Sequence, residues 1–195
     1  MQGKRCIKLA DTKASIRGDI AAIKPCDDVE QVHIADALAW IDSGANIFRI
    51  DAPDKPPKHL VAYFVLVDPD HGSILLGDHI KAQLWLPSGG HVELNELPVD
   101  TVRREIEEEL YIQAEFLQGK QTPFFLTQTQ TVGLTPGHTD VSLWYLLRGD
   151  IHAPLTFDRG SYTDMAWFGF KEILDSHPAI FDAHMHRFVN KLIAR

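Results

Sequence analysis

Cysteine and long apolar runs are scarce in this chain. Cys6 and Cys26 are the only cysteines among 195 residues, too few for a disulfide framework and without the spacing of a metal site. No apolar run is long enough to span a bilayer, and charges interrupt the N-terminal stretch where a signal peptide would have its apolar core. We therefore expect a protein of the reducing cytoplasm.

Basic residues are also in the minority. The 19 lysines and arginines are outnumbered by 27 acidic residues, which leaves a formal net charge of −8. Nucleic-acid polymers and anionic membranes favour basic surfaces, so we expect neither as a partner. A small phosphorylated substrate remains compatible with this charge, because bound metal ions can neutralise phosphates locally.

The first 57 residues predict a helical N-terminal extension that ends in a proline-rich linker. One helix is expected at 15–23, and a second begins after Asp27 or Asp28, continues to residue 41 and ends before Gly44. Prolines between residues 53 and 57 favour a stiff linker. We expect the helices to cover the core or to form part of a homodimer interface. The expected apolar face of the second helix consists of Val32, Ala35, Leu38 and Ile41.

From residue 58 to residue 195 the pattern is that of a mixed α and β domain. Runs rich in β-branched and aromatic residues alternate with turns such as 68–72, which predicts several short strands. Strands are expected at 60–67, 73–77, 83–86, 124–131 and 141–148, and closing helices at 171–174 and 181–194.

Four glutamates lie close together between residues 105 and 109. Like charges three or four residues apart on a helix repel, so the cluster makes sense if a cation lies among them. Mg2+ prefers carboxylate oxygens and completes its shell with substrate phosphates. At about 100° per residue, Glu105, Glu108 and Glu109 share one helix face, while Glu107 points to solvent. The alternative is an ordinary solvated acidic face.

An apolar stripe adjoins this carboxylate face and predicts how the helix docks. Pro98 suits the first helical turn, where its missing N–H is not needed. The stripe that would pack on the core consists of Val99, Val102, Ile106 and Leu110.

The spacing around the cluster is more specific than the cluster itself. It reads Gly90-x5-Glu96-x7-Arg104-Glu105-Ile106-x-Glu108-Glu109-Leu110-Tyr111-Ile112 and follows a Pro-Ser-Gly-Gly loop at 87–90. This segment resembles the Nudix box, Gly-x5-Glu-x7-Arg-Glu-apolar-x-Glu-Glu-x-Gly-apolar. Every position agrees except Tyr111, which stands where the family has its second glycine. The chain is thereby similar to Nudix hydrolases over about residues 58–195.

The resemblance implies both a fold and an activity. The fold would be α+β, an α/β/α sandwich with a mixed β-sheet that follows the N-terminal helical extension. The activity would be a pyrophosphohydrolase dependent on Mg2+, with Mn2+ as a substitute, which attacks a nucleoside diphosphate linked to another moiety. A (deoxy)nucleoside triphosphate is the favoured substrate. ADP-ribose or a nucleotide sugar remains an alternative, as does an inactive module that only binds a nucleotide.

The resemblance also implies roles for individual residues. The carbonyl of Gly89 would join Glu105, Glu108 and Glu109 as metal ligands. Arg104 would orient Glu105 by a charge-assisted hydrogen bond. Gly90 and Glu96 would support the loop against the helix.

Residues outside the glutamate cluster complete the expected site. Asp140 ends a loop rich in glycine and proline, so it is either an extra catalytic acid or a turn cap. His91 and His138 are candidate contacts to substrate phosphates. The general base therefore stays open between Glu105 and a distant acid such as Asp140.

Tyr111 is the departure from the family pattern. A glycine there usually stops the helix with a positive φ, which tyrosine adopts poorly. We expect the helix either to end one residue later or to bear strain, with catalysis retained because the position holds no ligand.

Overall fold

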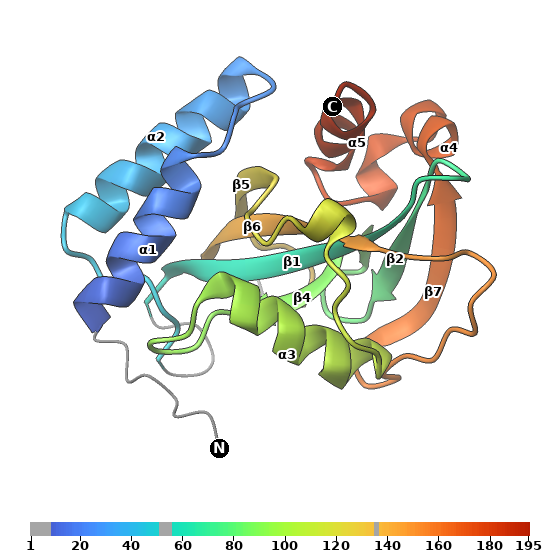
Figure 1. The fold of residues 1–195 in the computed structure, drawn as a ribbon, viewed down its shortest axis with the longest axis horizontal. Helices are drawn as coiled ribbons and strands as arrows, with labels where there is room; N and C mark the ends of the chain where they lie inside the picture. The colour runs from blue at the N-terminus through green and yellow to red at the C-terminus, as the bar shows by residue number, and fades with distance from the viewer. Residues whose placement is uncertain (1–8, 51–55, 135–136) are drawn as a thin grey trace.

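A computed structural model describes residues 9–50, 56–134 and 137–195 (Figure 1). Cys6, most of the expected proline-rich linker and part of the loop before Asp140 lie outside these ranges. None of the helices in the described ranges has the length and apolar character needed to cross a bilayer. The helices are α1 (Leu9–Ala21), α2 (Asp28–Asp42), α3 (Pro98–Leu110), α4 (Phe170–Asp175) and α5 (Met185–Ile193), with 3-10 turns at Leu117–Gly119 and Pro178–Ile180.

The strands form one mixed sheet around β1. Their bounds are β1 (Lys58–Asp68), β2 (Ser73–His79), β3 (Leu84–Leu86), β4 (Ser88–His91), β5 (Phe125–Gln130), β6 (Thr139–Arg148) and β7 (Tyr162–Gly169). The order is β3-β2-β1-β6-β5, with β4 paired to β1 and β7 to β2. β1 runs parallel to β6 and antiparallel to β2 and β4. The predicted α+β fold with a mixed sheet is confirmed.

Alternate residues of β1 serve two different cores. Leu60, Ala62 and Phe64 belong to a core that includes buried residues of α1, α2 and α3. Val65 and Val67 belong to a second core with residues of α4 and α5. Side chains alternate across a strand, so this one strand anchors helices on both faces of the sheet (Figure 1).

The predicted second helix is confirmed in extent but only partly in orientation. Asp27 caps α2 by accepting from the Glu30 N–H, and Gly44 follows the helix with a φ of 80°. The expected apolar face is confirmed for Leu38 and Ile41, which pack on the core. It is wrong for Val32, which is 64% exposed, and for the exposed Ala35, whereas Glu30 and Ala37 are fully buried. A buried glutamate occupies the packed face, and a search for apolar spacing cannot find it.

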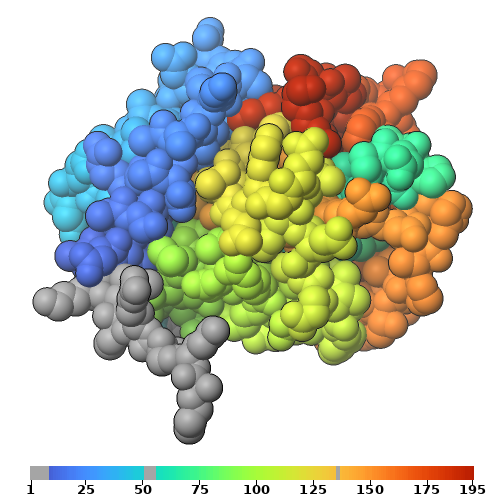
Figure 2. Space-filling model, viewed as in Figure 1, coloured from blue at the N-terminus to red at the C-terminus, as the bar shows by residue number. Residues whose placement is uncertain are grey.

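Glu30 joins the N-terminal extension to the edge of the sheet. Its Oε1 accepts from the Leu126 backbone N–H at 3.2 Å and from Lys191 Nζ at 2.7 Å. His33 Nδ1 accepts from the next outward N–H of β5, that of Gln128, at 3.2 Å. Helix α2 thus pairs with donors of an edge strand that would otherwise be open to another chain. In Figure 2 the blue surface of α1 and α2 directly adjoins the green and yellow surfaces of the domain.

The C-terminal helix begins later than expected. Residues 181–184 were predicted as helix, but α5 begins at Met185. Asp182 instead donates its backbone N–H to the Trp85 carbonyl and accepts from the His184 N–H through Oδ1. These contacts hold the segment against β3. The first helix also differs, since it spans 9–21 rather than 15–23.

Helix α3 matches the sequence prediction closely and shows what Tyr111 does. Pro98 is in its first turn, and Val102, Ile106 and Leu110 are buried. The helix ends at Leu110, and Tyr111 adopts the left-handed conformation with φ 58° and ψ 28°. The family's helix stop is therefore kept by a residue with a Cβ, and the strain is borne locally.

We predict that Tyr111→Gly stabilises the protein. The tyrosine side chain is 60% exposed, so little packing is lost, while the left-handed strain disappears. The expected gain in the free energy of unfolding is about 0.5–1 kcal/mol, less than the full strain because glycine makes the unfolded chain more flexible. Denaturant titration measures it. Ile112→Gly is the matched control at a neighbouring exposed position without positive φ, and it should lower stability. A loss of stability in both variants would contradict the inference that Tyr111 is strained.

Candidate active site

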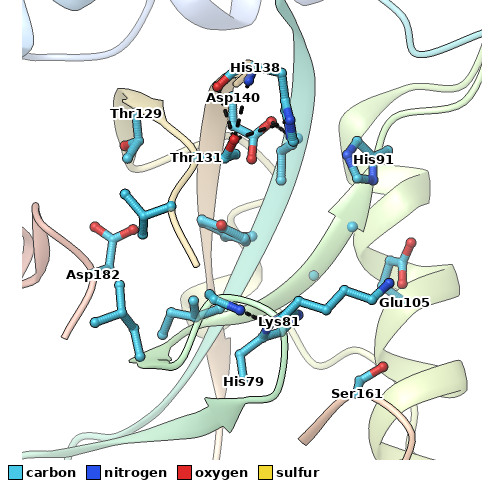
Figure 3. Close-up of a pocket in the computed structure, with 18 of the residues that line it drawn as sticks. His79, Lys81, His91, Glu105, Thr129, Thr131, His138, Asp140, Ser161 and Asp182 are labelled. Carbon is cyan, nitrogen blue, oxygen red and sulfur yellow. Dashed lines mark hydrogen bonds and ion pairs between the residues drawn. The ribbon is translucent and has the colours of Figure 1, made fainter. Parts of the chain in front are cut away.

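A cavity of about 1390 Å³ opens beside β4 and the N-terminal end of β6 (Figure 3). The wall of this cavity includes most of the site residues predicted from the sequence, both within the glutamate cluster and before and after it in the chain. Those lining it are Gly89, Gly90, His91, Arg104, Glu105, Glu109, His138 and Asp140. Arg49 and Lys81 also line it, and the Lys81 side chain extends toward Glu105 in Figure 3. The structure therefore brings together most of the predicted site.

The two glycines of β4 allow α3 to approach the sheet. A Cβ on Gly89 would lie 2.2 Å from the Ala62 carbonyl oxygen, and φ there is 144°. A Cβ on Gly90 would lie 2.0 Å from Glu105 Oε1 and 2.4 Å from its Cδ. Gly89 is thus required by the backbone of β1, whereas Gly90 is required by the Glu105 carboxylate itself.

Arg104 is the hub of the acidic cluster. Its Nε and Nη2 each lie 3.1 Å from a different oxygen of Glu96, and its Nη1 lies 2.6 Å from Glu105 Oε1. Nη2 also donates to the His91 carbonyl at 3.2 Å, and Nη1 lies 3.4 Å from Glu108. Such paired, charge-assisted bonds fix both carboxylates in position. This geometry suits the predicted roles of Arg104 as the orienting residue and of Glu96 as the brace.

Glu109 is more deeply buried than its helical position suggested. It is 8% exposed, and its Oε2 accepts from the Gly89 N–H and the Tyr162 hydroxyl, both at 3.0 Å. Burial, with the nearby charge of Glu105, raises its pKa to about 8. Beside its predicted role as a metal ligand, the Glu109 carboxylate therefore joins α3 to β4 and β7.

The other two predicted carboxylate ligands differ from each other. Burial raises the pKa of Glu105, and the neighbouring Arg104 partly offsets that rise. Glu108 has a 59% exposed side chain and is not among the residues that line the cavity. Glu107 is exposed, as predicted. Two of the three candidate ligands therefore line the cavity, with Glu108 at its rim beside Arg104.

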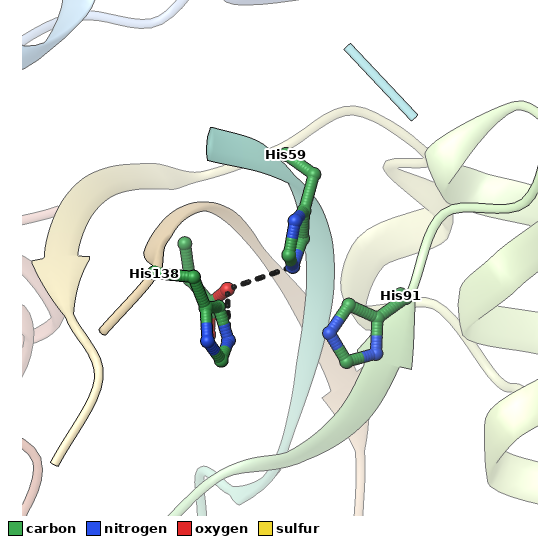
Figure 4. A group of neighbouring side chains, drawn as sticks. His59, His91 and His138 are labelled. Atoms are coloured by element: carbon green, nitrogen blue, oxygen red, sulfur yellow. Dashed lines mark ion pairs between the residues drawn. The ribbon is translucent and has the colours of Figure 1, made fainter. Parts of the chain in front are cut away.

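Asp140 lies across the cavity from Glu105 (Figure 3) and belongs to a cluster with three histidines, which Figure 4 shows. His59, His91, His138 and Asp140 each offer a ligand atom, and these atoms lie within 4.8 Å of one another. Asp140 Oδ1 is 3.3 Å from His59 Nε2 and 3.4 Å from His138 Nε2. The sequence prediction named three of these residues separately and missed His59. The parallel register that pairs His59 with Asp140 was not visible in the sequence.

The protonation of the cluster follows from its surroundings. Burial lowers the pKa of His91 to about 3, and the nearby charge of Arg49 acts in the same direction. Burial also lowers the pKa of His59, but Asp140 and the Pro56 carbonyl outweigh it, so the net shift is upward. At neutral pH, His91 is therefore an uncharged imidazole, whereas His59 has a carboxylate beside it.

Comparison with known proteins identifies the family. Residues 57–192 match the NUDIX domain. No protein of curated function matches the chain significantly. Among solved structures, a Nudix-family hydrolase from Clostridium perfringens has a TM-score of 0.53 at 19% identity, over 70% of this chain and 97% of that one. MutT Nudix hydrolase from Burkholderia pseudomallei has a TM-score of 0.53 at 22% identity, over 68% and 96%.

A third similar fold is the E. coli dihydroneopterin triphosphate pyrophosphohydrolase, with a TM-score of 0.51 at 15% identity over 74% of this chain and 99% of that one. The chain belongs to the Nudix family. It is a hydrolase that acts on pyrophosphate bonds, and the expected family resemblance is confirmed.

We predict that Gly90→Ala lowers turnover while the fold persists. Gly90 does not have a positive φ, so the new methyl group meets mainly the flexible Glu105 side chain and displaces its carboxylate. A displacement of about 1 Å at a catalytic group can cost roughly 100-fold in kcat. Steady-state kinetics and a melting curve measure the effect. Gly18→Ala is the control, because nothing lies within 4 Å of its added methyl group. Normal turnover in Gly90→Ala would show that the position of Glu105 is unimportant.

Proposed function

We propose that this protein is a Mg2+-dependent pyrophosphohydrolase whose preferred substrate is a nucleoside or deoxynucleoside triphosphate. The observation that supports it best is the pair of carboxylates on the wall of a cavity large enough for a nucleotide, the partly buried Glu105 and the buried Glu109. Both have pKa values raised by burial, which means that the protein alone provides too little positive charge for them.

The donor set suits a hard divalent cation. Arg104 holds Glu105 through Oε1, while Gly89 and Tyr162 hold Glu109 through Oε2. Each carboxylate thus keeps its second oxygen without a hydrogen bond to the described residues. Together with the Gly89 carbonyl and Glu108 at the rim, these oxygens are the kind of ligand that Mg2+ takes. Bound there, Mg2+ would lower the pKa of a water molecule and neutralise phosphate charge.

We assign the general base to Glu105. Its carboxylate lies within the cavity, and Arg104 fixes its orientation. Asp140 remains the alternative, but its Oδ1 lies between His59 and His138, so accepting a proton there would compete with these contacts. Loss of a base acts mainly on kcat, so the kcat and KM of Glu105→Gln and Asp140→Asn compare the two candidates.

Cations around the cavity support a polyphosphate substrate. Arg49 and Lys81 line the same cavity as the carboxylates and can attract phosphates that the metal does not contact. ADP-ribose and nucleotide sugars carry fewer charged oxygens and are the alternatives. Assays of phosphate or pyrophosphate release with Mg2+ would separate the possibilities, using nucleoside triphosphates, ADP-ribose and nucleotide sugars. An inactive binding module would release nothing from any of them, although it would still bind a nucleotide.

We predict that Glu109→Gln loses nearly all hydrolysis without losing its fold. The glutamine oxygen can still accept from Gly89 and Tyr162, whereas the charge that holds a cation is gone. Loss of a few kcal/mol of transition-state stabilisation would lower kcat by roughly 10²–10³-fold. The melting temperature without metal should be unchanged near neutral pH and higher above the pKa of about 8, where Glu109 is a buried charge and glutamine is not.

Glu107→Gln is the matched control for this variant. It makes the same substitution on the same helix, at an exposed position away from the cavity. It should hydrolyse like the wild type. Near-normal turnover of Glu109→Gln at saturating substrate and Mg2+ would refute the metal assignment.

Activity should also disappear on metal removal. A chelator in excess over Mg2+ should abolish hydrolysis, and added Mg2+ or Mn2+ should restore it, because the carboxylates need the cation to bind phosphates. Full activity in the chelator would exclude a divalent metal from the reaction.

A further inference from the structure

We propose that His59, His91, His138 and Asp140 form a second metal site, selective for a transition metal such as Zn2+ and separate from the carboxylates of α3. Three imidazoles and one carboxylate converge from β1, β4, β6 and the residue before β6 (Figure 4). Their ligand atoms lie within 4.8 Å of one another. This site is independent of the proposed substrate and of the Mg2+ site.

Two buried atoms at the centre of the cluster lack hydrogen bonds. His59 Nε2 and Asp140 Oδ1 face each other at 3.3 Å, yet neither makes a hydrogen bond to the described residues. His59 Nδ1 lies 2.8 Å from the Pro56 carbonyl oxygen, which can only accept, so Nδ1 carries the proton. In the neutral ring, Nε2 then presents a lone pair to a carboxylate oxygen. Either a proton on Nε2 or a metal cation between the two atoms satisfies both, since unpaired buried acceptors are costly. The metal has the further support of His91 and His138, whose ligand atoms lie within the same 4.8 Å.

The spacing fits tetrahedral coordination. Asp140 Oδ1 is 3.3 Å from His59 Nε2 and 3.4 Å from His138 Nε2. Nitrogen and oxygen ligands at about 2.0–2.1 Å from a tetrahedral zinc ion lie roughly 3.3 Å apart. The contacts of Asp140 with His59 and with His138 therefore already have the spacing of neighbouring zinc ligands. Every other separation among the four ligand atoms is at most 4.8 Å, so modest inward shifts of the side chains complete a tetrahedral site.

The outer contacts of two imidazoles match those of metal ligands. Histidines that bind a metal use their other ring nitrogen to donate to a fixed oxygen, which sets the ring orientation. His59 does this with the Pro56 carbonyl, and His138 Nδ1 lies 3.1 Å from Thr131 Oγ1. Both arrangements direct Nε2 toward Asp140.

The donor types separate this site from the one on α3. Imidazole suits zinc and other borderline transition metals, whereas Mg2+ favours oxygen ligands and retains water. Three imidazoles and one carboxylate should therefore select Zn2+ over Mg2+, and the oxygen-rich cluster on α3 should do the reverse. The chain thus has two donor sets of different chemistry along one cavity.

Arg49 is the group that opposes metal binding. Its Nη1 lies 3.4 Å from His91 Nε2, so the guanidinium competes with a metal for that nitrogen. Arg49 is only partly buried, and its long side chain can move toward solvent. Removing this charge should strengthen metal binding.

The test is metal binding to the full chain with millimolar Mg2+ present, so that the carboxylates of α3 are occupied. Isothermal titration of Zn2+ into this Mg2+-containing solution should give one site per chain. Co2+ should give the intense visible absorption of a tetrahedral complex. Asp140→Asn and His91→Ala should each weaken Zn2+ binding at least 10-fold, and Arg49→Gln should strengthen it.

Two controls make the assignment specific. His152→Asn removes a histidine outside the cluster and should leave Zn2+ binding unchanged. Glu109→Gln should also keep Zn2+ binding while it loses hydrolysis, which separates failure of this proposal from failure of the Mg2+ assignment. If Asp140→Asn does not fold, as judged by circular dichroism, His91→Ala at the cavity wall decides the outcome. Absence of a Zn2+ site in the wild type, or wild-type Zn2+ affinity in folded cluster variants, would overturn the proposal.

Discussion

The pairing of β1 with β4 on one side and β6 on the other is the constraint on which the site depends. The parallel register puts His59 beside Asp140, and the antiparallel register puts Gly89 beside Tyr63 and His91 beside Val61. A shift by one residue would move each of these side chains to the opposite face of the sheet. The glycines, the histidine cluster and the docking surface for α3 therefore share a single register.

The carboxylates of α3 lie in a partly buried environment of low dielectric constant, and this is a second constraint on the site. Helix α3 holds Glu105 and Glu109 against the sheet, where burial raises both pKa values, that of Glu109 to about 8. Arg104 neutralises only part of this cluster and bonds most strongly to Glu96 and Glu105. A fold that concentrates negative charge in this way favours any cation that enters the cavity. Ionising these carboxylates costs free energy in the metal-free protein, and a bound cation removes that cost.

The N-terminal extension also places a charged side chain inside the protein. Glu30 is fully buried, and its charge is met by Lys191 from α5 and by the Leu126 N–H of β5. Breaking one partner of a buried pair costs more than the pair itself contributes, so α2, α5 and the edge strand depend on one another. The extension thus covers an edge of the sheet and is held there by the buried ion pair and hydrogen bond of Glu30.

Local pattern determined much of this protein by itself. The spacing from Gly90 to Ile112 identified the family, and the 3.6-residue period placed Val102, Ile106 and Leu110 in the core and Glu107 in solvent. Periodicity gives the direction of a side chain but not the depth to which it is buried, so only the tertiary structure decided that Glu109 is enclosed and Glu108 is at the rim. His59 and Glu30 were missed for a related reason. Their partners are distant in sequence, at Asp140 and Leu126, and strand register and helix packing bring them together.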